Sequence, residues 1–169
     1  MEIIDNAISE SDLKEIQDSL LSPAFPWFFN RHTIDEHTAV DNINDYQLCH
    51  SFYVDSNQYG YVGSDHFKLV EPILEKLQTR ILIRIKANLR TPAPQKDMIV
   101  DYHSDYDLKS ETAIFYVNTN NGYTIFKDSQ KKVESVENRL VVFPTELEHS
   151  GVSCTDTKQR VVINFNFIR

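Results

Sequence analysis

The feature that most constrains the fold of this chain is a regular alternation of apolar and polar side chains over residues 80–90, RILIRIKANLR. Successive side chains of a β-strand point to opposite faces, so a period of two predicts a strand with one covered face and one polar face. The apolar positions are Ile81, Ile83, Ile85, Ala87 and Leu89. The polar positions are Arg80, Arg84, Lys86, Asn88 and Arg90.

Short apolar runs continue from this segment to the end of the chain. Turn-forming segments separate them, such as NTNNG at 118–122 and CTDTK at 154–158. Asn, Asp, Gly and Ser favour turns because they tolerate left-handed backbone or bond to their own backbone. We therefore expect strands at about 99–103, 111–118, 123–127, 131–136, 139–143, 148–153 and 159–168.

The first half of the chain has a different pattern. Residues 9–21 have a helical stripe that Ser9 or Ser11 can cap, and a second helix is expected over 65–79, divided or restarted at Pro72. A strand is expected at 47–54, and PAFPWFFN at 23–30 suggests a buried aromatic segment. Helices followed by about eight short strands predict a mainly β (α+β) fold, a barrel of the jelly-roll or cupin type with the N-terminal helices packed outside.

We expect one domain over residues 1–169, with a helical part at about 1–79 and the barrel at about 80–169. The formal net charge of −8 makes nucleic acid an unlikely partner, because phosphate contacts need a basic surface. No apolar stretch is long enough for a membrane span, and the acidic start MEIIDNAISESD has no features of a signal peptide. Only Cys49 and Cys154 are present, so we expect a reduced, cytoplasmic protein without a disulfide framework.

Three residues form a candidate metal site. His103 and Asp105 lie two apart in YHSDY, so on a strand both side chains would share one face. His149, in LEHSGVS, follows after several predicted strands, which is enough chain to return beside the first pair. Two imidazoles and one carboxylate suit a non-haem Fe(II) ion and leave coordination positions open. The alternative for the His-x-Asp pair is an ordinary surface pair.

Arg160 strengthens this hypothesis. It begins the apolar segment QRVVINFNF and shares a face with Asn164 and Asn166. A buried arginine needs an anion, and a dicarboxylate cosubstrate that chelates iron at one end could supply it at the other. A structural salt bridge to an acidic residue is the alternative. Tyr116, and less strongly Asn88 and Asn164, are further candidates for binding such a cosubstrate, although a buried tyrosine also bonds readily to a backbone carbonyl.

Two segments of the sequence each have two possible interpretations. The face with Arg84, Lys86 and Arg90 is either a solvated surface or a receptor for an acidic substrate group. The loop 55–64, with Tyr59 and Tyr61, is either a lid over the substrate or an exposed turn.

The segments YHSDY, TAIFYVNTNNGYTIF and ENRLVVFPTELEHSGVSCTDTKQRVVINFNF resemble the 2-oxoglutarate/Fe(II) dioxygenases of the prolyl 4-hydroxylase-like branch, especially the small forms of phages and marine bacteria. The resemblance covers residues 80–169 well and the N-terminal helices loosely. It implies a double-stranded β-helix in the cytoplasm of a bacterium or phage-infected cell. It also implies the cosubstrates 2-oxoglutarate and O2 and hydroxylation of an unactivated C–H bond. His103, Asp105 and His149 match the family's metal ligands, Arg160 its carboxylate-binding basic residue, and Tyr116 an assisting tyrosine.

The sequence departs from the family pattern in two places. Asn121-Gly122 replaces a Gly-Gly pair, and a tryptophan frequent on the last strand of animal members is absent. These departures leave the substrate open: a prolyl residue in a peptide, another amino-acid side chain, or a small molecule. Two other functions also remain open, a metalloenzyme that does not use 2-oxoglutarate and a cupin-like metal-binding module. The oligomeric state is not predicted.

Overall fold

A computed structural model describes residues 1–32, 46–56, 60–99, 102–106 and 109–169. The predicted lid over 55–64 falls partly outside these ranges, at Tyr59, and the side chain of Tyr61 is also not described. The lid therefore stays a prediction.

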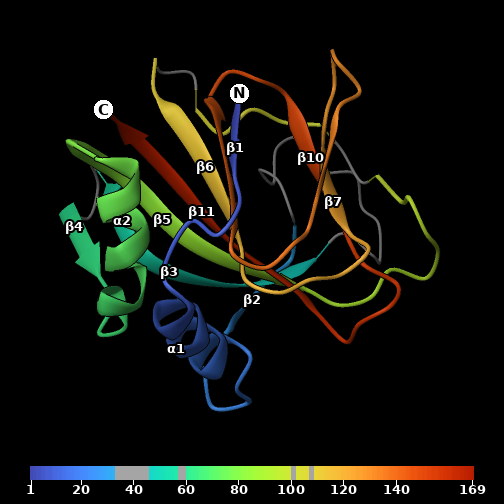
Figure 1. Ribbon diagram of the computed structural model, residues 1–169, viewed down its shortest axis with the longest axis horizontal. Helices are drawn as coiled ribbons and strands as arrows, with labels where there is room; N and C mark the ends of the chain where they lie inside the picture. The colour runs from blue at the N-terminus through green and yellow to red at the C-terminus, as the bar shows by residue number, and fades with distance from the viewer. Residues whose placement is uncertain (33–45, 57–59, 100–101, 107–108) are drawn as a thin grey trace.

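The described residues form a large antiparallel sheet and a small one (Figure 1). The large sheet has the order β1-β9-β6-β11-β5-β3-β2, and β4 pairs with β3. Its strands are β1 (Glu2–Ile4), β2 (Phe28–Asn30), β3 (Gln47–Ser56), β4 (Gly60–Gly63), β5 (Ile81–Arg90), β6 (Glu111–Tyr116), β9 (Arg139–Pro144) and β11 (Arg160–Ile168). The small sheet has the order β10-β7-β8. Its strands are β7 (Tyr123–Phe126), β8 (Lys132–Glu134) and β10 (His149–Val152).

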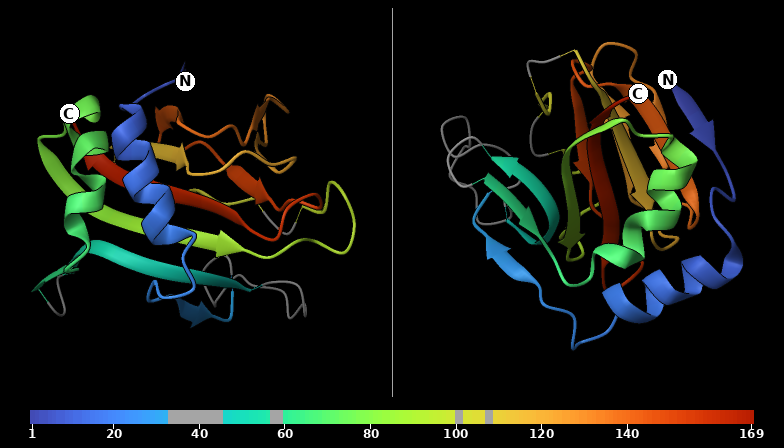
Figure 2. Two further views of the ribbon diagram at one scale, coloured as in Figure 1. Left: turned by 60° about the horizontal axis from the view of Figure 1, so that its bottom comes forward. Right: turned by 90° about the vertical axis from the view of Figure 1, so that its left-hand side faces the viewer.

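The helices lie against one face of the large sheet (Figure 2). Helix α1 (Glu10–Leu20) begins after Ser9, whose hydroxyl accepts a hydrogen bond from the backbone N–H of Asp12. A 3-10 turn, η1 (Phe67–Val70), leads directly into α2 (Glu71–Leu77). Pro72 stands in the first turn of α2, where its missing N–H costs no helical hydrogen bond. The helix predicted over 65–79 is thus a turn and a short helix, and Pro72 starts the second part.

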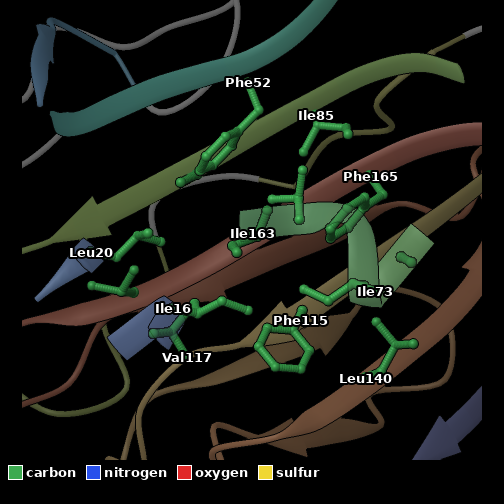
Figure 3. Packing of buried hydrophobic residues seen from close by; sticks show 14 of the residues in the cluster. Ile16, Leu20, Phe52, Ile73, Ile85, Phe115, Val117, Leu140, Ile163 and Phe165 are labelled. Atoms are coloured by element: carbon green, nitrogen blue, oxygen red, sulfur yellow. The ribbon is translucent and has the colours of Figure 1, made fainter. Parts of the chain in front are cut away.

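The main core lies between these helices and the sheet. Phe115, Ile163 and Phe165 project from the central strands toward Ile16, Leu20 and Ile73 of the helices (Figure 3). A second cluster fills part of the opposite face, where β6 and β9 meet the small sheet. Its buried members are Ile114, Tyr116, Phe126, Val133, Val141, Phe143 and Val162. This two-sheet arrangement with helices outside confirms the predicted fold class, a mainly β double-stranded β-helix.

Four local predictions are corrected. Residues 99–103 form no strand where they are described, because this segment meets β10 only at an isolated bridge between His103 and His149. Phe28 and Phe29 are exposed, because β2 is an edge strand. The alternation predicted over 80–90 fails at its start. The pairing of β5 with β11 shifts register at Asn166/Phe167, and Leu82 packs against the core there while Ile81 is exposed. Finally, the segment 1–79 also contributes strands β1–β4 to the large sheet, so it is not only helical.

Candidate metal centre and cosubstrate pocket

The structure brings His103, Asp105 and His149 together. One potential ligand atom from each residue lies within 4.8 Å of those of the other two. His149 begins β10, and His103 lies opposite it because the two backbones exchange hydrogen bonds, His103 N to His149 O at 3.0 Å and His149 N to His103 O at 2.9 Å. The predicted grouping is therefore present, although the His103–Asp105 segment is not the strand from which it was inferred.

Hydrogen bonding leaves the imidazoles able to bind a metal. The Nδ1 atom of His149 lies 3.0 Å from the carbonyl oxygen of Leu147, which can only accept, so Nδ1 carries the proton and the lone pair lies on Nε2. The ring packs edge-on against Phe143, with Phe126 farther away. Burial and the neighbouring His149 lower the pKa of His103 to about 4, so this ring is neutral near pH 7. Its buried Nδ1 has no hydrogen-bond partner among the described residues.

Asp105 is held in place by the large sheet. Its Oδ2 accepts hydrogen bonds from Thr112 of β6 at 3.0 Å and Asn166 of β11 at 2.9 Å, and its Oδ1 accepts one from Arg84 of β5 at 3.0 Å. Burial raises the pKa of this carboxyl, but the Arg84 guanidinium and the two imidazoles outweigh that effect and lower it to about 2. Asp105 is therefore an oriented carboxylate at neutral pH, as a metal ligand must be.

A cavity of about 720 Å³ opens beside this group. Arg160 lies in its wall with only 3% of its surface exposed. Its Nε donates to Ser135 Oγ at 2.9 Å and its Nη2 to Thr124 Oγ1 at 3.4 Å. No carboxylate among the described residues pairs with it, which argues against the structural salt bridge considered above. Burial lowers the pKa of the guanidinium, yet arginine stays charged in proteins, so this cation has no counter-ion within the described ranges.

Asn88 and Asn164 also line the cavity, as their predicted role requires. The buried Oδ1 of each amide has no partner in the described part of the chain. Buried polar groups are nearly always hydrogen-bonded in folded proteins, so two such oxygens in one wall indicate a site for a polar ligand. Their roles remain predictions.

Tyr116 is placed differently from the prediction. It is fully buried in the second cluster, does not line the cavity where the structure describes it, and donates its hydroxyl proton to Thr124 Oγ1 at 2.8 Å. Thr124 faces the cavity in its place and also accepts the bond from Arg160. The structure shows Tyr116 bonded to Thr124, and direct contact between Tyr116 and a cosubstrate stays a prediction.

The sequence alone did not identify several residues of the site. Thr112 and Asn166 hold Asp105, and Ser135 and Thr124 hold Arg160, all through contacts between segments distant in sequence. Of these four residues, only Asn166 could have been recognised from the sequence, because the alternation in the last predicted strand places it on the same face as Arg160. Arg84, Lys86 and Arg90 line the cavity and are partly buried, which favours a ligand-facing wall over a solvated surface.

These residues fit an Fe(II) ion and an acidic cosubstrate. Two imidazoles and one carboxylate are an oxygen and nitrogen donor set of the kind found in non-haem iron enzymes. Arg160, which has no carboxylate partner in the described ranges, lies in the same cavity and offers a carboxylate-binding end, whereas the two amide oxygens there can accept hydrogen bonds from a ligand. The fold and this site together define a barrel of the double-stranded β-helix class with a candidate metal centre at its open side.

Comparison with solved structures leads to the same class. A 2OG-Fe(II) oxygenase family oxidoreductase from Burkholderia pseudomallei has a TM-score of 0.68 at 13% identity, covering 98% of this chain and 84% of its own. A prolyl hydroxylase from Trichoplax adhaerens, in complex with a hypoxia inducible factor peptide, has a TM-score of 0.64 at 13% identity, covering 98% and 82%. A Pseudomonas putida prolyl-4-hydroxylase has a TM-score of 0.52 at 14% identity, covering 99% and 92%.

At these identities the likeness shows the fold, and the resemblance inferred from the sequence is confirmed at that level. No family model and no curated protein matches the sequence. None of the helices in the described ranges is long and apolar enough to cross a membrane.

Proposed function

We propose that this protein is an Fe(II)- and 2-oxoglutarate-dependent dioxygenase that hydroxylates an unactivated C–H bond. The observation that carries the proposal is Arg160, a buried cation without a carboxylate partner among the described residues, in the cavity that the His103, Asp105 and His149 group borders. A metalloenzyme or binding module without an acidic cosubstrate would have no need for this arrangement. The fold likeness to 2OG-Fe(II) oxygenases supports the proposal.

The chain's residues have distinct tasks in this proposal. His103, Asp105 and His149 hold the metal, and bound iron with 2-oxoglutarate supplies the oxidising chemistry, in which dioxygen is reduced as 2-oxoglutarate is decarboxylated to succinate. Arg160 binds the distal carboxylate, and Ser135 and Thr124 orient the guanidinium. Ile114 and Val162 also line the cavity, and their apolar side chains would limit water beside the metal.

The experiment combines spectroscopy with turnover. Under anaerobic conditions, Fe(II) plus 2-oxoglutarate should give a weak visible charge-transfer band, and aerobic protein should form succinate. Arg160→Gln should weaken 2-oxoglutarate binding by about a hundredfold, because it removes one member of a buried charge pair. Arg169→Gln is the control, since Arg169 is partly exposed and pairs with Glu111. Absence of both the band and succinate in the native protein would refute the assignment, as would normal 2-oxoglutarate affinity in Arg160→Gln.

The substrate is a separate part of the proposal. Two of the similar structures are prolyl hydroxylases, so a prolyl residue or another amino-acid side chain should be screened first, as a peptide and as a small molecule. Succinate formation above the uncoupled rate would identify a substrate. A uniform rate across the screen would count against these substrates but not against the dioxygenase assignment.

A further inference from the structure

The wall of the cavity formed by β5 is strongly cationic. Arg84, Lys86 and Arg90 project into the cavity from alternate positions of this strand, and Arg160 lies on the neighbouring strand β11. Among the described residues that line the cavity, only Asp105 and Glu148 carry carboxylates. Glu148 is already paired with Lys127 at 2.8 Å. This excess of positive charge stands out in a chain whose formal net charge is −8.

Most of these cations have a partner or an assigned ligand. Arg84 donates to Asp105 and Asn166, and Arg90 donates to the carbonyl oxygen of Gly151 at 2.7 Å. Arg160 binds the cosubstrate in the proposed function. The ammonium group of Lys86, by contrast, makes no hydrogen bond or ion pair with any residue in the described ranges.

Lys86 lies among polar groups that also lack partners. It is opposite Asn164 on β11 and two positions from Asn88 on its own strand, and the Oδ1 atoms of both asparagines are buried and unbonded within the described chain. Burial, and then the charge of Arg84, lower the pKa of Lys86, consistent with a cation enclosed in the cavity wall. A lysine on a solvated face would not experience this environment.

The cosubstrate does not remove the excess charge, because the charges of Fe(II) and of the 2-oxoglutarate dianion cancel. We propose that the cavity binds a small anionic substrate through a carboxylate or phosphate group held by Lys86, and that the amide oxygens of Asn88 and Asn164 accept hydrogen bonds from donor groups on the same molecule. As a statement about the substrate this rests on the proposed function, but the anion site itself is independent of iron. The substrate class is thus an acidic small molecule, for which a neutral peptide would be a poor replacement.

Backbone amide NMR can test this site with simple probes. The protein is loaded with Zn(II) in place of iron and saturated with 2-oxoglutarate, which occupies Arg160, and is then titrated with acetate, inorganic phosphate and neutral acetamide. We expect acetate or phosphate, but not acetamide, to shift the amides around Lys86 saturably. Lys86→Met should weaken that binding on the order of tenfold, because it removes a charged hydrogen-bond donor. Lys131→Met, at an exposed lysine, should bind as the native protein does.

The outcomes separate the two proposals. The larger response, to acetate or to phosphate, identifies the anionic group. The anion site is refuted if neither anion shifts these amides, or if Lys86→Met responds as the native protein does. If the protein fails to bind 2-oxoglutarate, the proposed function fails. The anion titration is then repeated on metal-free Arg160→Gln protein, where a response that depends on Lys86 still supports the site and its absence overturns it.

Discussion

The two faces of strand β11 have opposite chemical character. Val161, Ile163, Phe165 and Phe167 point toward the helices and are completely buried. The opposite face points toward the cavity and carries Arg160, Val162, Asn164 and Asn166. The first face gains stability from apolar burial. The second holds a cation that has no carboxylate partner, and an amide oxygen that has no hydrogen-bond partner, in the described chain, at a cost to stability. Such a cost is expected where a ligand supplies the missing partner.

The largest loss of stability is expected from a substitution on the helix-facing side of β11. Phe165→Ala should lower the free energy of unfolding by about 3–5 kcal/mol, because it removes a fully buried ring from the main core and leaves a cavity. Urea denaturation measures this change. The affinity of the folded fraction for 2-oxoglutarate should stay close to that of the native protein. A loss of stability below about 1 kcal/mol would show that this face is not the main source of stability.

The next largest effect is a loss of stability at acid pH, which we expect from His103 on the cavity side. The pKa of His103 is about 4 in the folded protein, against 6.5 for an ordinary histidine. Above pH 6.5 the ring is neutral in both states, so the full stability is present. As the pH falls from 6.5 to about 4, only the unfolded state takes up the proton and the metal-free protein loses stability, by about 3 kcal/mol.

Urea denaturation with a chelator, compared at about pH 7 and about pH 4.5, tests this prediction. The variant His103→Gln has no proton to gain at this position and should lose less stability over the same interval. An equal loss in both proteins would assign the acid sensitivity to other groups. A further loss below pH 3.8 is expected from Asp105, whose folded pKa is about 2.

The same comparison explains what the sequence could and could not predict. The alternation in β5 and β11 is a local property, so it correctly indicated the sheet and placed Arg160 and Asn164 on one face. Alternation cannot distinguish a solvated surface from the wall of a cavity, so the position of Lys86 was left open. The grouping of His103 with Asp105 was predicted from strand parity, but it depends instead on one bridge to His149 and on the hydrogen bonds to Asp105. Those contacts join distant segments and leave no local pattern.

A smaller effect is expected where the backbone approaches Arg160. A Cβ atom on Gly122 would lie 2.7 Å from Arg160 Cδ and 2.8 Å from the carbonyl oxygen of Val152, too close for either. Gly122→Ala should therefore cost about 1–3 kcal/mol of stability and raise the KM for 2-oxoglutarate by displacing the guanidinium. Gly151→Ala is the matched control for stability, because its Cβ would lie 3.5 Å from Arg160 Nη1, an ordinary contact. If both variants were equally stable, the close packing behind Arg160 would be unimportant.

The smallest change, and the one that separates the two faces most sharply, is Asn164→Leu. Leucine has nearly the shape of asparagine and removes a buried oxygen that has no partner within the described residues, so stability should stay the same or rise by up to about 1 kcal/mol. Binding of acetate beside Lys86 should stay close to that of the native protein, because the lost amide oxygen accepts hydrogen bonds and acetate has none to donate. Urea denaturation and the NMR titration measure the two effects. A loss of stability above about 2 kcal/mol would mean that Asn164 serves the fold, and the contrast between the faces of β11 would then not hold at this position.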